Sequence, residues 1–323
     1  MPTLLLTGND IRDLLSMEET LAAVERAFKE MASGKGKMPP KAYLVLERGD
    51  FRAMPAALPG AAGMKWVNVH PQNPAQGLPT VMAILIYNDP LTGYPLAIMD
   101  ATEITAYRTG AAAAIASRYL ARKDSQILGI IGAGQQAHTQ LLAHLEIFDF
   151  KQIRVFDLSE EATEKFIASF PGYPVRRCSL EETAASDILC TLTPSRTPIV
   201  KREWIKPGTH INAVGADAKG KEELEPSLLK TAIVVVDDLV QASAAGEINV
   251  PVSRGLFSRD DIHATLGEII TGRKPGRKDE RAITIFDSTG VAIEDIAVAR
   301  FLYEKASQTG KYLSVDFIPG NYP

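Results

Sequence analysis

The chain has 323 residues, of which 46% are hydrophobic and 23% are charged, with 35 basic and 39 acidic side chains. This composition is typical of a globular protein, and the length suggests about two domains. Because there is no basic excess to neutralise phosphates, we expect no nucleic-acid partner.

The beginning of the chain, MPTLLLTGNDIRD, lacks the basic flank and the apolar core of a signal peptide. No apolar run approaches the ~20 residues of a membrane span. The two cysteines, Cys178 and Cys190, do not form a C-x-x-C pair, and so few thiols are typical of a reducing cytosol. We therefore expect a cytoplasmic protein without a membrane partner.

The first third of the chain predicts one helix and several strands. Ser16 and Glu19 fit a capping box, and the apolar spacing after them predicts a helix that ends at Gly34. Extended segments follow, separated by the turn sequences RGD, PGAAG and NDPLTG. They cover residues 41–47, 51–58, 64–69 and 79–88. Because no long helix intervenes, we expect these strands to be mostly antiparallel.

Residues 101–122 predict a helix rich in alanine, and from Ser125 onward strands and helices alternate. The predicted strands are residues 126–132, 152–157, 187–193, 210–217, 231–238 and 282–290. A helix is predicted to begin near Gln135, and residues 291–307 predict a closing helix. This alternation predicts a parallel sheet with helices on both faces, and hence an α/β fold. Because the composition changes near residues 118–124, we place a domain boundary there.

The sequence GIIGAGQQA matches a dinucleotide-binding fingerprint, with Gly132, Gly134 and Ala137 at its key positions. A predicted strand precedes it and a predicted helix follows, which is the context that phosphate binding requires. Asp157 ends the second strand, 25 residues after Gly132, where its carboxylate can bind ribose hydroxyls and would repel a 2′-phosphate. The pattern therefore favours NAD over NADP. The alternative is a glycine turn that binds nothing.

Polar residues follow three of the predicted strands, at the edge where doubly wound sheets bind ligands. They are Thr193, Ser195, Asp217, Asp287, Ser288 and Thr289. Asp217 follows Gly215 and Ala216, whose small size allows close approach of the chain or of a cofactor. The alternative for Asp217 is a helix-capping or turn residue.

Lys65 is the only charged residue in GMKWVNVHP, a stretch that predicts a buried strand. A buried ammonium is costly unless it is paired or used. Arg108 lies among alanines in its predicted helix. The alternative to a functional role is exposure to solvent, with Lys65 at a sheet edge and Arg108 on the wet face of its helix. For Lys41 and Arg52, which lie on predicted strands, solvent exposure is a stronger alternative. We find no nucleophile elbow and no clustered metal ligands, and we expect no metal.

Several motifs stand in the order seen in the ornithine cyclodeaminase/μ-crystallin family. They are MPPK, RAMPA, KWVNVHPQNP.QGLPTVMA, PLAIMDAT, RTGAAAAIA, IIGAGQQA, INAVGAD, GEI and FDSTGVAI.D, where a dot marks a variable position. The resemblance covers nearly the whole chain, and within the family the chain is similar to the archaeal-type NAD-dependent alanine dehydrogenases. It implies a central Rossmann NAD-binding domain at residues 119–295. It also implies a second α+β domain for substrate binding and homodimer formation, built from residues 1–118 with 296–323.

The resemblance also implies roles for individual residues. Lys65 corresponds to the active-site lysine of the family, and Asp217 to its acid/base aspartate. The implied substrate contacts are Lys41, Arg52, Arg108 and Thr289. The implied cofactor contacts are Thr80, Arg108, Thr109, Gly132, Gly134, Gln135, Gln136, Asp157, Thr193, Val214, Gly215, Ala216, Asp217, Lys221 and Ser288.

Residue 52 departs from the cyclodeaminase pattern. Ornithine cyclodeaminases carry a glutamate there, which suits a substrate with a second ammonium group, whereas Arg52 would repel that group and could pair with a carboxylate. This favours a small monoamine as the substrate. The alternatives are a cyclodeaminase of ornithine or a related diamino acid, a cyclic-imine (ketimine) reductase, and a non-enzymatic, crystallin-like binding protein.

The function implied is NAD-dependent oxidative deamination of L-alanine to pyruvate and ammonia through an imine. In that chemistry Asp217 would activate the water that attacks the iminium, and Lys65 would relay protons. Because Lys65 would lie near Arg108 and Lys41 and be partly desolvated, we expect its pKa to be lowered.

Overall fold

The structure is a computed structural model that describes residues 2–318. The chain divides into two units: unit 1 runs up to Arg108 and resumes at Val291, and unit 2 is Thr109–Gly290. The predicted boundary after residue 118 lies ten residues beyond Arg108, and the one after residue 295 lies five residues beyond Gly290. The predicted assignment of a function to each domain stays a prediction. Among the described residues, no helix combines the length and the apolar character needed to cross a membrane.

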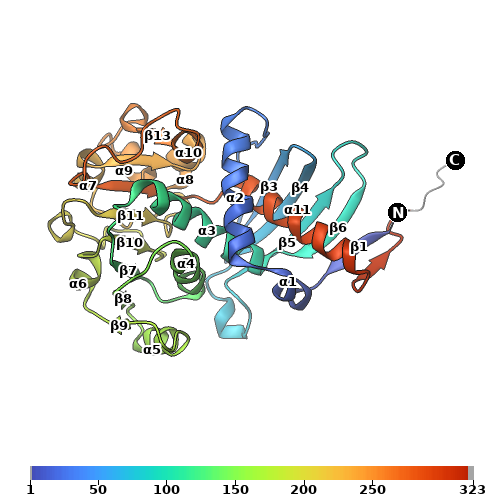
Figure 1. The fold of residues 1–323 in the computed structure, drawn as a ribbon, viewed down its shortest axis with the longest axis horizontal. Coiled ribbons are helices and arrows are strands. Elements are labelled where there is room, and N and C mark those ends of the chain that lie inside the picture. The colour runs from blue at the N-terminus through green and yellow to red at the C-terminus, as the bar shows by residue number, and fades with distance from the viewer. Residues whose placement is uncertain (1, 319–323) are drawn as a thin grey trace. The chain divides into compact units, whose positions relative to one another are not determined.

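Unit 1 is built on a seven-stranded sheet in the order β15-β1-β6-β5-β4-β3-β2 (Figure 1). Its strands are β1 (Thr3–Leu6), β2 (Ala42–Leu46), β3 (Gly49–Leu58), β4 (Ala61–Val69), β5 (Val81–Asn88), β6 (Pro95–Asp100) and β15 (Leu313–Val315). Strands β2 to β6 pair antiparallel, which confirms the prediction for the four segments that were predicted, and β1 pairs with β6 in parallel. Strands β1, β6 and β15 were not predicted from the sequence.

Helices α2 (Met17–Ala32) and α11 (Ala292–Thr309) lie against one face of this sheet (Figure 1). Unit 1 also contains α1 (Gly8–Leu14), the short η1 (Asn73–Gln76) and the part of α3 (Thr102–Leu120) before Thr109. Half of the predicted capping box of α2 is present: the Ser16 hydroxyl accepts a hydrogen bond from the Glu19 amide at 3.4 Å, but no return bond from the Ser16 amide to the Glu19 carboxylate is formed. The Glu19 carboxylate pairs with Lys305 of α11 at 2.7 Å. Helix α11 packs against α2, β3 and β4.

Unit 2 is built on an eight-stranded parallel sheet in the order β13-β12-β14-β11-β10-β7-β8-β9. Its strands are β7 (Ile127–Ile131), β8 (Gln152–Phe156), β9 (Val175–Arg177), β10 (Ile188–Thr191), β11 (His210–Ala213), β12 (Ile233–Val236), β13 (Ala264–Thr265) and β14 (Thr284–Asp287). This confirms the predicted parallel sheet, although β9 and β13 were not predicted. The chain leaves β7 toward β8 and returns to β10 on the other side, so β7 and β10 flank the topological switch point.

Two apolar cores cover the two faces of the unit 2 sheet. Because side chains alternate along a strand, Leu189 of β10 joins one core while its neighbours Ile188 and Cys190 join the other. The helices that contribute side chains to these cores are α4 (Gln135–Leu145), α5 (Glu160–Ala168), α6 (Leu180–Ala184), α7 (Pro226–Thr231), α8 (Leu239–Ala245), α9 (Asn249–Ser253) and η2 (Arg202–Trp204). Unit 2 also contains α10 (Leu266–Ile270) and η3 (Arg259–Asp261). The predicted cover on both faces is confirmed.

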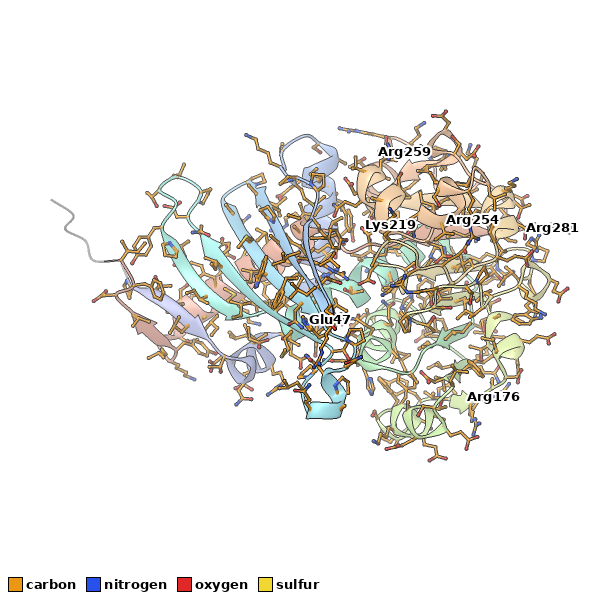
Figure 2. The ribbon with its side chains drawn as sticks, turned by 180° about the vertical axis from the view of Figure 1, so that it is seen from behind. Glu47, Arg176, Lys219, Arg254, Arg259 and Arg281 are labelled. Carbon is orange, nitrogen blue, oxygen red and sulfur yellow. The ribbon has the colours of Figure 1, made fainter. Side chains whose placement is uncertain are left out.

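The distribution of buried charge differs between the units. Long charged side chains such as Glu47, Arg176 and Arg281 are exposed (Figure 2). The buried charged residues among those described are Lys41, Arg52, Lys65, Arg108, Glu222, Glu223, Asp237, Glu247, Asp287, Glu294 and Asp295. Setting histidine aside, unit 1 therefore buries charges of both signs, whereas the charged side chains buried in unit 2 are all carboxylates.

A buried polar network lies on one face of the unit 2 sheet. The His210 ring contacts Thr284 at 2.8 Å and Asn212 at 3.1 Å, and the Asn212 amide donates to Ser117 at 2.9 Å. Ser117 in turn contacts His144 at 2.9 Å. Burial lowers the pKa of His210 to about 3 and that of His144 to about 4, so both rings are neutral in the folded protein.

These lowered pKa values predict acid sensitivity. Unfolded histidines titrate near 6.5, so between about pH 6.5 and 4 the unfolded chain binds protons that folded His210 does not, and stability falls as the pH falls. We expect the thermal unfolding midpoint of the His210→Asn variant to decline less steeply over this range than that of the unsubstituted protein. His263→Asn, at a partly exposed ring, is the control. Equal slopes for His210→Asn and the unsubstituted protein would contradict the prediction.

Candidate active site

The glycine-rich turn of unit 2 joins β7 to α4. Gly132 has a φ of +100°, and a Cβ at this position would lie 3.2 Å from the carbonyl carbon of Leu192. A larger residue would therefore be strained and would strike the neighbouring loop. A Cβ on Gly134 would meet nothing within 4 Å, so open space lies beside the turn at this point.

The first turn of α4 is available for an anion. Gly134 is the N-cap of this helix, and no side chain caps its amide groups. Such amides point out of the helix end and carry partial positive charge. The open space beside Gly134 and the uncapped helix end together form a cradle for a phosphate-sized group. The side-chain oxygen of Gln136 is buried there without a hydrogen-bond partner among the described residues.

Asp157 follows β8, which is the strand next to β7 in the sheet. Its Oδ2 accepts a hydrogen bond from the Ala133 amide at 2.7 Å, and its Oδ1 accepts one from the Ser159 amide at 2.8 Å. The carboxylate is thus held against the glycine-rich turn. Because two carboxylate oxygens can accept about four hydrogen bonds, Asp157 can still bind hydroxyl groups.

Glu223 fixes the loops that follow β10 and β11. Its Oε1 accepts hydrogen bonds from the Thr193 amide and hydroxyl, both at 2.7 Å. Its Oε2 accepts from the Thr191 hydroxyl at 2.8 Å and from the Gly215 amide at 3.0 Å. Burial raises the pKa of Glu223, but the hydrogen bonds oppose this shift, and four converging donors favour the ionised form. One carboxylate therefore positions two of the loops that sequence analysis assigned to the cofactor.

Further buried carboxylates hold the neighbouring loops in the same way. Glu247 accepts hydrogen bonds from the amides of Glu223 and Leu224, at 2.9 and 2.6 Å. Asp287 accepts from the Glu247 amide at 2.9 Å. Asp237 accepts from the amide and the hydroxyl of Thr289, at 2.6 and 3.1 Å. Burial, with the nearby Glu223 carboxylate, raises the pKa of Glu247 well above its usual value.

Asp217 lies just beyond β11 and is partly buried. Its carboxylate forms an ion pair with Lys221, four residues later. The Ser288 hydroxyl, at the end of β14, is buried without a hydrogen-bond partner among the described residues. Unit 2 thus contains the predicted positions Thr109, Gly132, Gly134, Gln135, Gln136, Asp157, Thr193, Val214, Gly215, Ala216, Asp217, Lys221, Ser288 and Thr289.

Lys65 of β4 is fully buried in unit 1 and is the centre of an ion cluster. Its Nζ lies 2.6 Å from Asp295 Oδ1 and 3.1 Å from the Thr105 hydroxyl. Arg108 of α3 shares the same carboxylate, with Nε 3.1 Å from Asp295 Oδ1, and pairs through Nη1 with Glu294 at 2.9 Å. The strand, the helix before the unit boundary and the closing helix are therefore joined through charge.

The environment of Lys65 lowers its pKa from 10.5 to about 7. Burial is the main cause, and the Arg108 guanidinium adds to it, while Asp295 and Glu294 act in the opposite direction. This agrees with the lowered pKa predicted from the sequence, although the predicted contribution of Lys41 is not among the causes. A lysine with this pKa can both donate and accept a proton near neutral pH.

Arg52 lies on the same sheet face as Lys65. It pairs with Val67 across β3 and β4, and Lys65 is two residues from Val67, so the two basic side chains point the same way. Arg52 Nε donates to Asp50 Oδ1 at 2.7 Å, and the guanidinium lies over the Tyr43 ring at 5.3 Å. Lys41, just before β2, is also buried. The structure therefore does not support solvent exposure for Lys41, Arg52, Lys65 or Arg108.

The acidic partners of Lys65, Arg108 and Arg52 were not predicted from the sequence. Asp295 ends the motif FDSTGVAI.D and Glu294 occupies its variable position, but no role was assigned to either, because acidic residues in the first turn of a helix are common for reasons of helix polarity alone. Asp50 gave a clearer signal, because it stands two residues from Arg52 in one strand and hence on one face. Thr80, a predicted cofactor contact, lies in unit 1 before β5.

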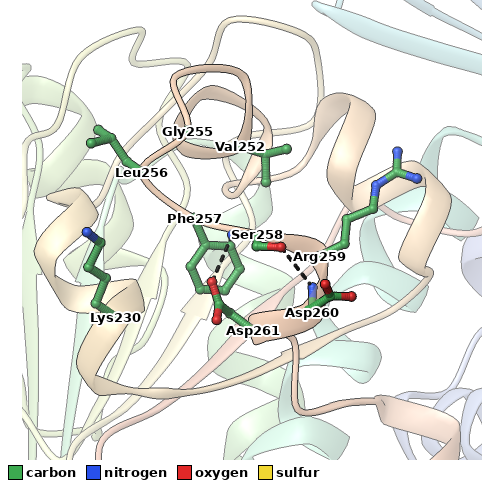
Figure 3. Close-up of a pocket in the computed structure, with 9 residues that line it drawn as sticks. All are labelled: Lys230, Val252, Gly255, Leu256, Phe257, Ser258, Arg259, Asp260 and Asp261. Carbon is green, nitrogen blue, oxygen red and sulfur yellow. Dashed lines mark hydrogen bonds between the residues drawn. The ribbon is translucent and has the colours of Figure 1, made fainter.

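A surface pocket of unit 2 contains none of the predicted residues. It is lined by Lys230, Val252, Gly255, Leu256, Phe257, Ser258, Arg259, Asp260 and Asp261 (Figure 3). Its polar groups bind one another: the Ser258 amide donates to Asp261 at 2.9 Å, and the Ser258 hydroxyl accepts from the Asp260 amide at 3.2 Å. We therefore assign no binding or catalytic role to this pocket.

Comparisons of sequence and of structure with known proteins find relatives in one family. The profile of the ornithine cyclodeaminase/mu-crystallin family matches residues 1–310. The alanine dehydrogenase of Archaeoglobus fulgidus is 54% identical over 308 residues, covering 95% of this chain and 96% of that protein. A solved archaeal alanine dehydrogenase, a dimer with bound NAD, superimposes with a TM-score of 0.97 at 52% identity and covers 98% of this chain and 100% of its own.

A second solved structure has a different activity. It is the Delta(1)-pyrroline-2-carboxylate reductase of Thermococcus litoralis, in complex with NADH and L-proline. It superimposes with a TM-score of 0.93 at 41% identity, over 96% of this chain and 99% of that one.

The contacts of Glu223 predict a stability effect. In Glu223→Gln one carboxylate oxygen becomes an amide nitrogen that cannot accept a hydrogen bond from the Thr193 or Gly215 amide. A buried amide without an acceptor costs about 1–3 kcal/mol, and we expect the free energy of unfolding in urea to fall by that amount. Glu203→Gln, at an exposed side chain, is the matched control. Equal stability of the two variants would contradict the prediction.

Proposed function

The chain belongs to the ornithine cyclodeaminase/mu-crystallin family, and from this premise we propose that it is an NAD-dependent amino-acid dehydrogenase that converts L-alanine to pyruvate and ammonia. The observation that carries the proposal is Lys65, a fully buried lysine whose pKa of about 7 suits proton transfer. The identity to alanine dehydrogenases over nearly the whole chain supports alanine as the substrate.

The turn geometry of unit 2 fits NAD. Bound NAD supplies the hydride acceptor. The pyrophosphate is assigned to the uncapped first turn of α4, beside the open space at Gly134. Asp157 is assigned to the adenosine ribose, and its carboxylate disfavours a 2′-phosphate. The next residue, Leu158, is 94% exposed and offers no positive charge to such a phosphate.

The buried basic side chains of unit 1 suit an amino-acid carboxylate. We assign Arg108, Lys41 and Arg52 to substrate binding, because buried guanidinium and ammonium groups bind carboxylates strongly. Arg52 already pairs with Asp50, so its charge is partly balanced within the strand. A second ammonium group on the substrate would still meet Arg52, which supports a monoamine rather than ornithine.

The proposed reaction requires two proton-handling residues. Hydride leaves Cα of alanine, and the resulting iminium carbon is attacked by water. We assign Asp217 as the general base for this water, and Lys65 as the group that takes up and returns the amine proton. The Asp217 carboxylate forms an ion pair with Lys221.

Cyclic-imine reduction is the second candidate. It transfers hydride to an imine carbon, and the resemblance to the Thermococcus litoralis reductase favours it over cyclodeamination. It would use the same lysine as the proton donor to the imine nitrogen. Only substrate turnover separates this candidate from alanine oxidation.

We also propose that the chain forms a homodimer through the outer face of the unit 1 sheet. Trp66 follows Lys65 and so points to the opposite face, where it stacks on Phe51 with ring centroids 5.2 Å apart. Ile84 pairs with Trp66, and Leu44 pairs with Phe51. Leu44, Trp66 and Ile84 are 52%, 38% and 54% exposed. Such an apolar face is typical of a surface that a partner covers.

Turnover and mutation test the reaction. We expect NAD reduction with L-alanine, NADH oxidation with pyruvate and ammonium, and little turnover of L-ornithine or of a five-membered cyclic imine. Lys65→Met removes the proton carrier and should lower kcat by about 10²–10⁴-fold, as should Asp217→Asn. NADH binding, followed by fluorescence, should persist in Lys65→Met. Lys165→Ala, at an exposed lysine, is the control.

Other outcomes would contradict the proposal. Undiminished alanine turnover in Lys65→Met would exclude the proton role of Lys65. Turnover of the cyclic imine alone would select the second candidate, and conversion of ornithine to proline would select a cyclodeaminase. NADH binding without turnover of any substrate would favour a crystallin-like binding protein.

Light scattering tests the dimer. We expect a mass twice the 35.0 kDa of one chain. A charge at the centre of the face, in Trp66→Glu, should yield the mass of one chain because burying an unpaired carboxylate is costly. Leu91→Glu, in an exposed loop of the same unit, should remain dimeric. A dimeric Trp66→Glu variant would exclude this face as the interface.

A further inference from the structure

The feature that the proposed mechanism leaves unexplained is Asp295. It lies in the first turn of α11, with no exposed surface, and its Oδ1 accepts from Lys65 Nζ at 2.6 Å and from Arg108 Nε at 3.1 Å. Its Oδ2 is buried without a hydrogen-bond partner among the described residues. A buried oxygen without a hydrogen-bond partner requires an explanation.

The contacts of Lys65 Nζ fix the direction of its lone pair when the amine is neutral. The nitrogen has three positions for hydrogen or a lone pair, and two of them are directed at Asp295 Oδ1 and the Thr105 hydroxyl. The Thr105 hydroxyl itself donates to the Ala101 carbonyl at 2.7 Å, so toward Lys65 it can only accept. When Lys65 is neutral, its two N–H groups therefore point at these acceptors. Its lone pair occupies the third position.

We propose that Asp295 is a positioning residue for Lys65, aiming the lone pair of its nitrogen and setting how readily it releases a proton. The inference rests on the proposed function, in which Lys65 exchanges protons with the substrate amine. No covalent step is involved: one proton moves onto Lys65 and later returns. Asp295 acts only through Lys65 and needs no contact with the substrate.

The charges around Lys65 determine the sign of the effect. The charged groups acting on it are Arg108 from α3 and Glu294 and Asp295 from α11. Arg108 favours the neutral amine, and the two carboxylates favour the ammonium, with Asp295 the stronger because it is in contact. Burial alone would lower the pKa of Lys65 further, so Asp295 keeps it near 7. Removing this negative charge should make Lys65 release its proton at lower pH.

The matched pair of variants is Asp295→Asn and Glu294→Gln. Both remove one buried carboxylate from the same helical turn, but only Asp295 contacts Lys65. The titration of Lys65 is followed by NMR of the protein labelled with ¹³C at lysine Cε, with Lys65→Met for assignment. We expect a midpoint near pH 7 in the unsubstituted protein. It should be lower by about 1–3 pH units in Asp295→Asn, and it should shift less in Glu294→Gln.

The pH profile of kcat/KM gives the second measurement. Because the neutral amine accepts the proton in alanine oxidation, activity rises with pH through the Lys65 midpoint, and this limb should move to lower pH in Asp295→Asn. An unmoved NMR midpoint, or one moved no further than in Glu294→Gln, would overturn the proposal. A moved NMR midpoint with an unmoved activity limb would support the effect on Lys65 and instead overturn the proton role of Lys65 in the proposed function.

A conservative variant covers a failure of Asp295→Asn to fold. Asp295→Glu keeps the charge but displaces the carboxylate by one methylene group. We expect the Lys65 midpoint to stay near that of the unsubstituted protein while kcat falls at least tenfold, because the nitrogen is no longer aimed correctly. Unchanged kcat in Asp295→Glu would overturn the positioning role.

Discussion

Unit 1 depends on the burial of one ammonium group. Lys65 has no exposed surface, and a charge in such a place is strongly destabilising unless an opposite charge meets it. Asp295 meets it, and Arg108 adds a second cation that Glu294 balances. The closing helix α11 is consequently more than an apolar cover for the sheet. Its acidic first turn completes a site whose cations come from β4 and α3.

In unit 2 the buried groups that need partners are backbone amides. The loops beyond its parallel strands leave backbone amides that no strand or helix can pair, and buried amides need acceptors. Glu223, Glu247, Asp237 and Asp287 supply them, each binding amides from segments distant in the chain. These loops carry the positions assigned to the cofactor. Their shape therefore follows from carboxylates that the cofactor itself is not assigned to touch.

The parts of the site that the sequence predicts are the local ones. The turn at Gly132 and the helix after it follow from residues within one strand–turn–helix unit, and Asp157 follows from the next strand. The partner of Lys65 could not be predicted in this way, because Asp295 lies 230 residues further along the chain. Short strands such as β1 and β15 escaped prediction for the same reason, since their pairing is with distant segments. The pair Arg52–Asp50 was predictable from strand alternation and was missed.

The split of unit 1 along the chain has a consequence for biosynthesis. A ribosome extends the chain from the N-terminus, so all of unit 2 emerges before α11 exists. During that interval the carboxylates of Asp295 and Glu294 are not yet available to Lys65 and Arg108, and the strand that bears Lys65 cannot be buried without a large electrostatic cost. Continuous domains can fold as they are made. Unit 2 can therefore mature during translation, whereas the unit that contains Lys65 must wait for its last helix.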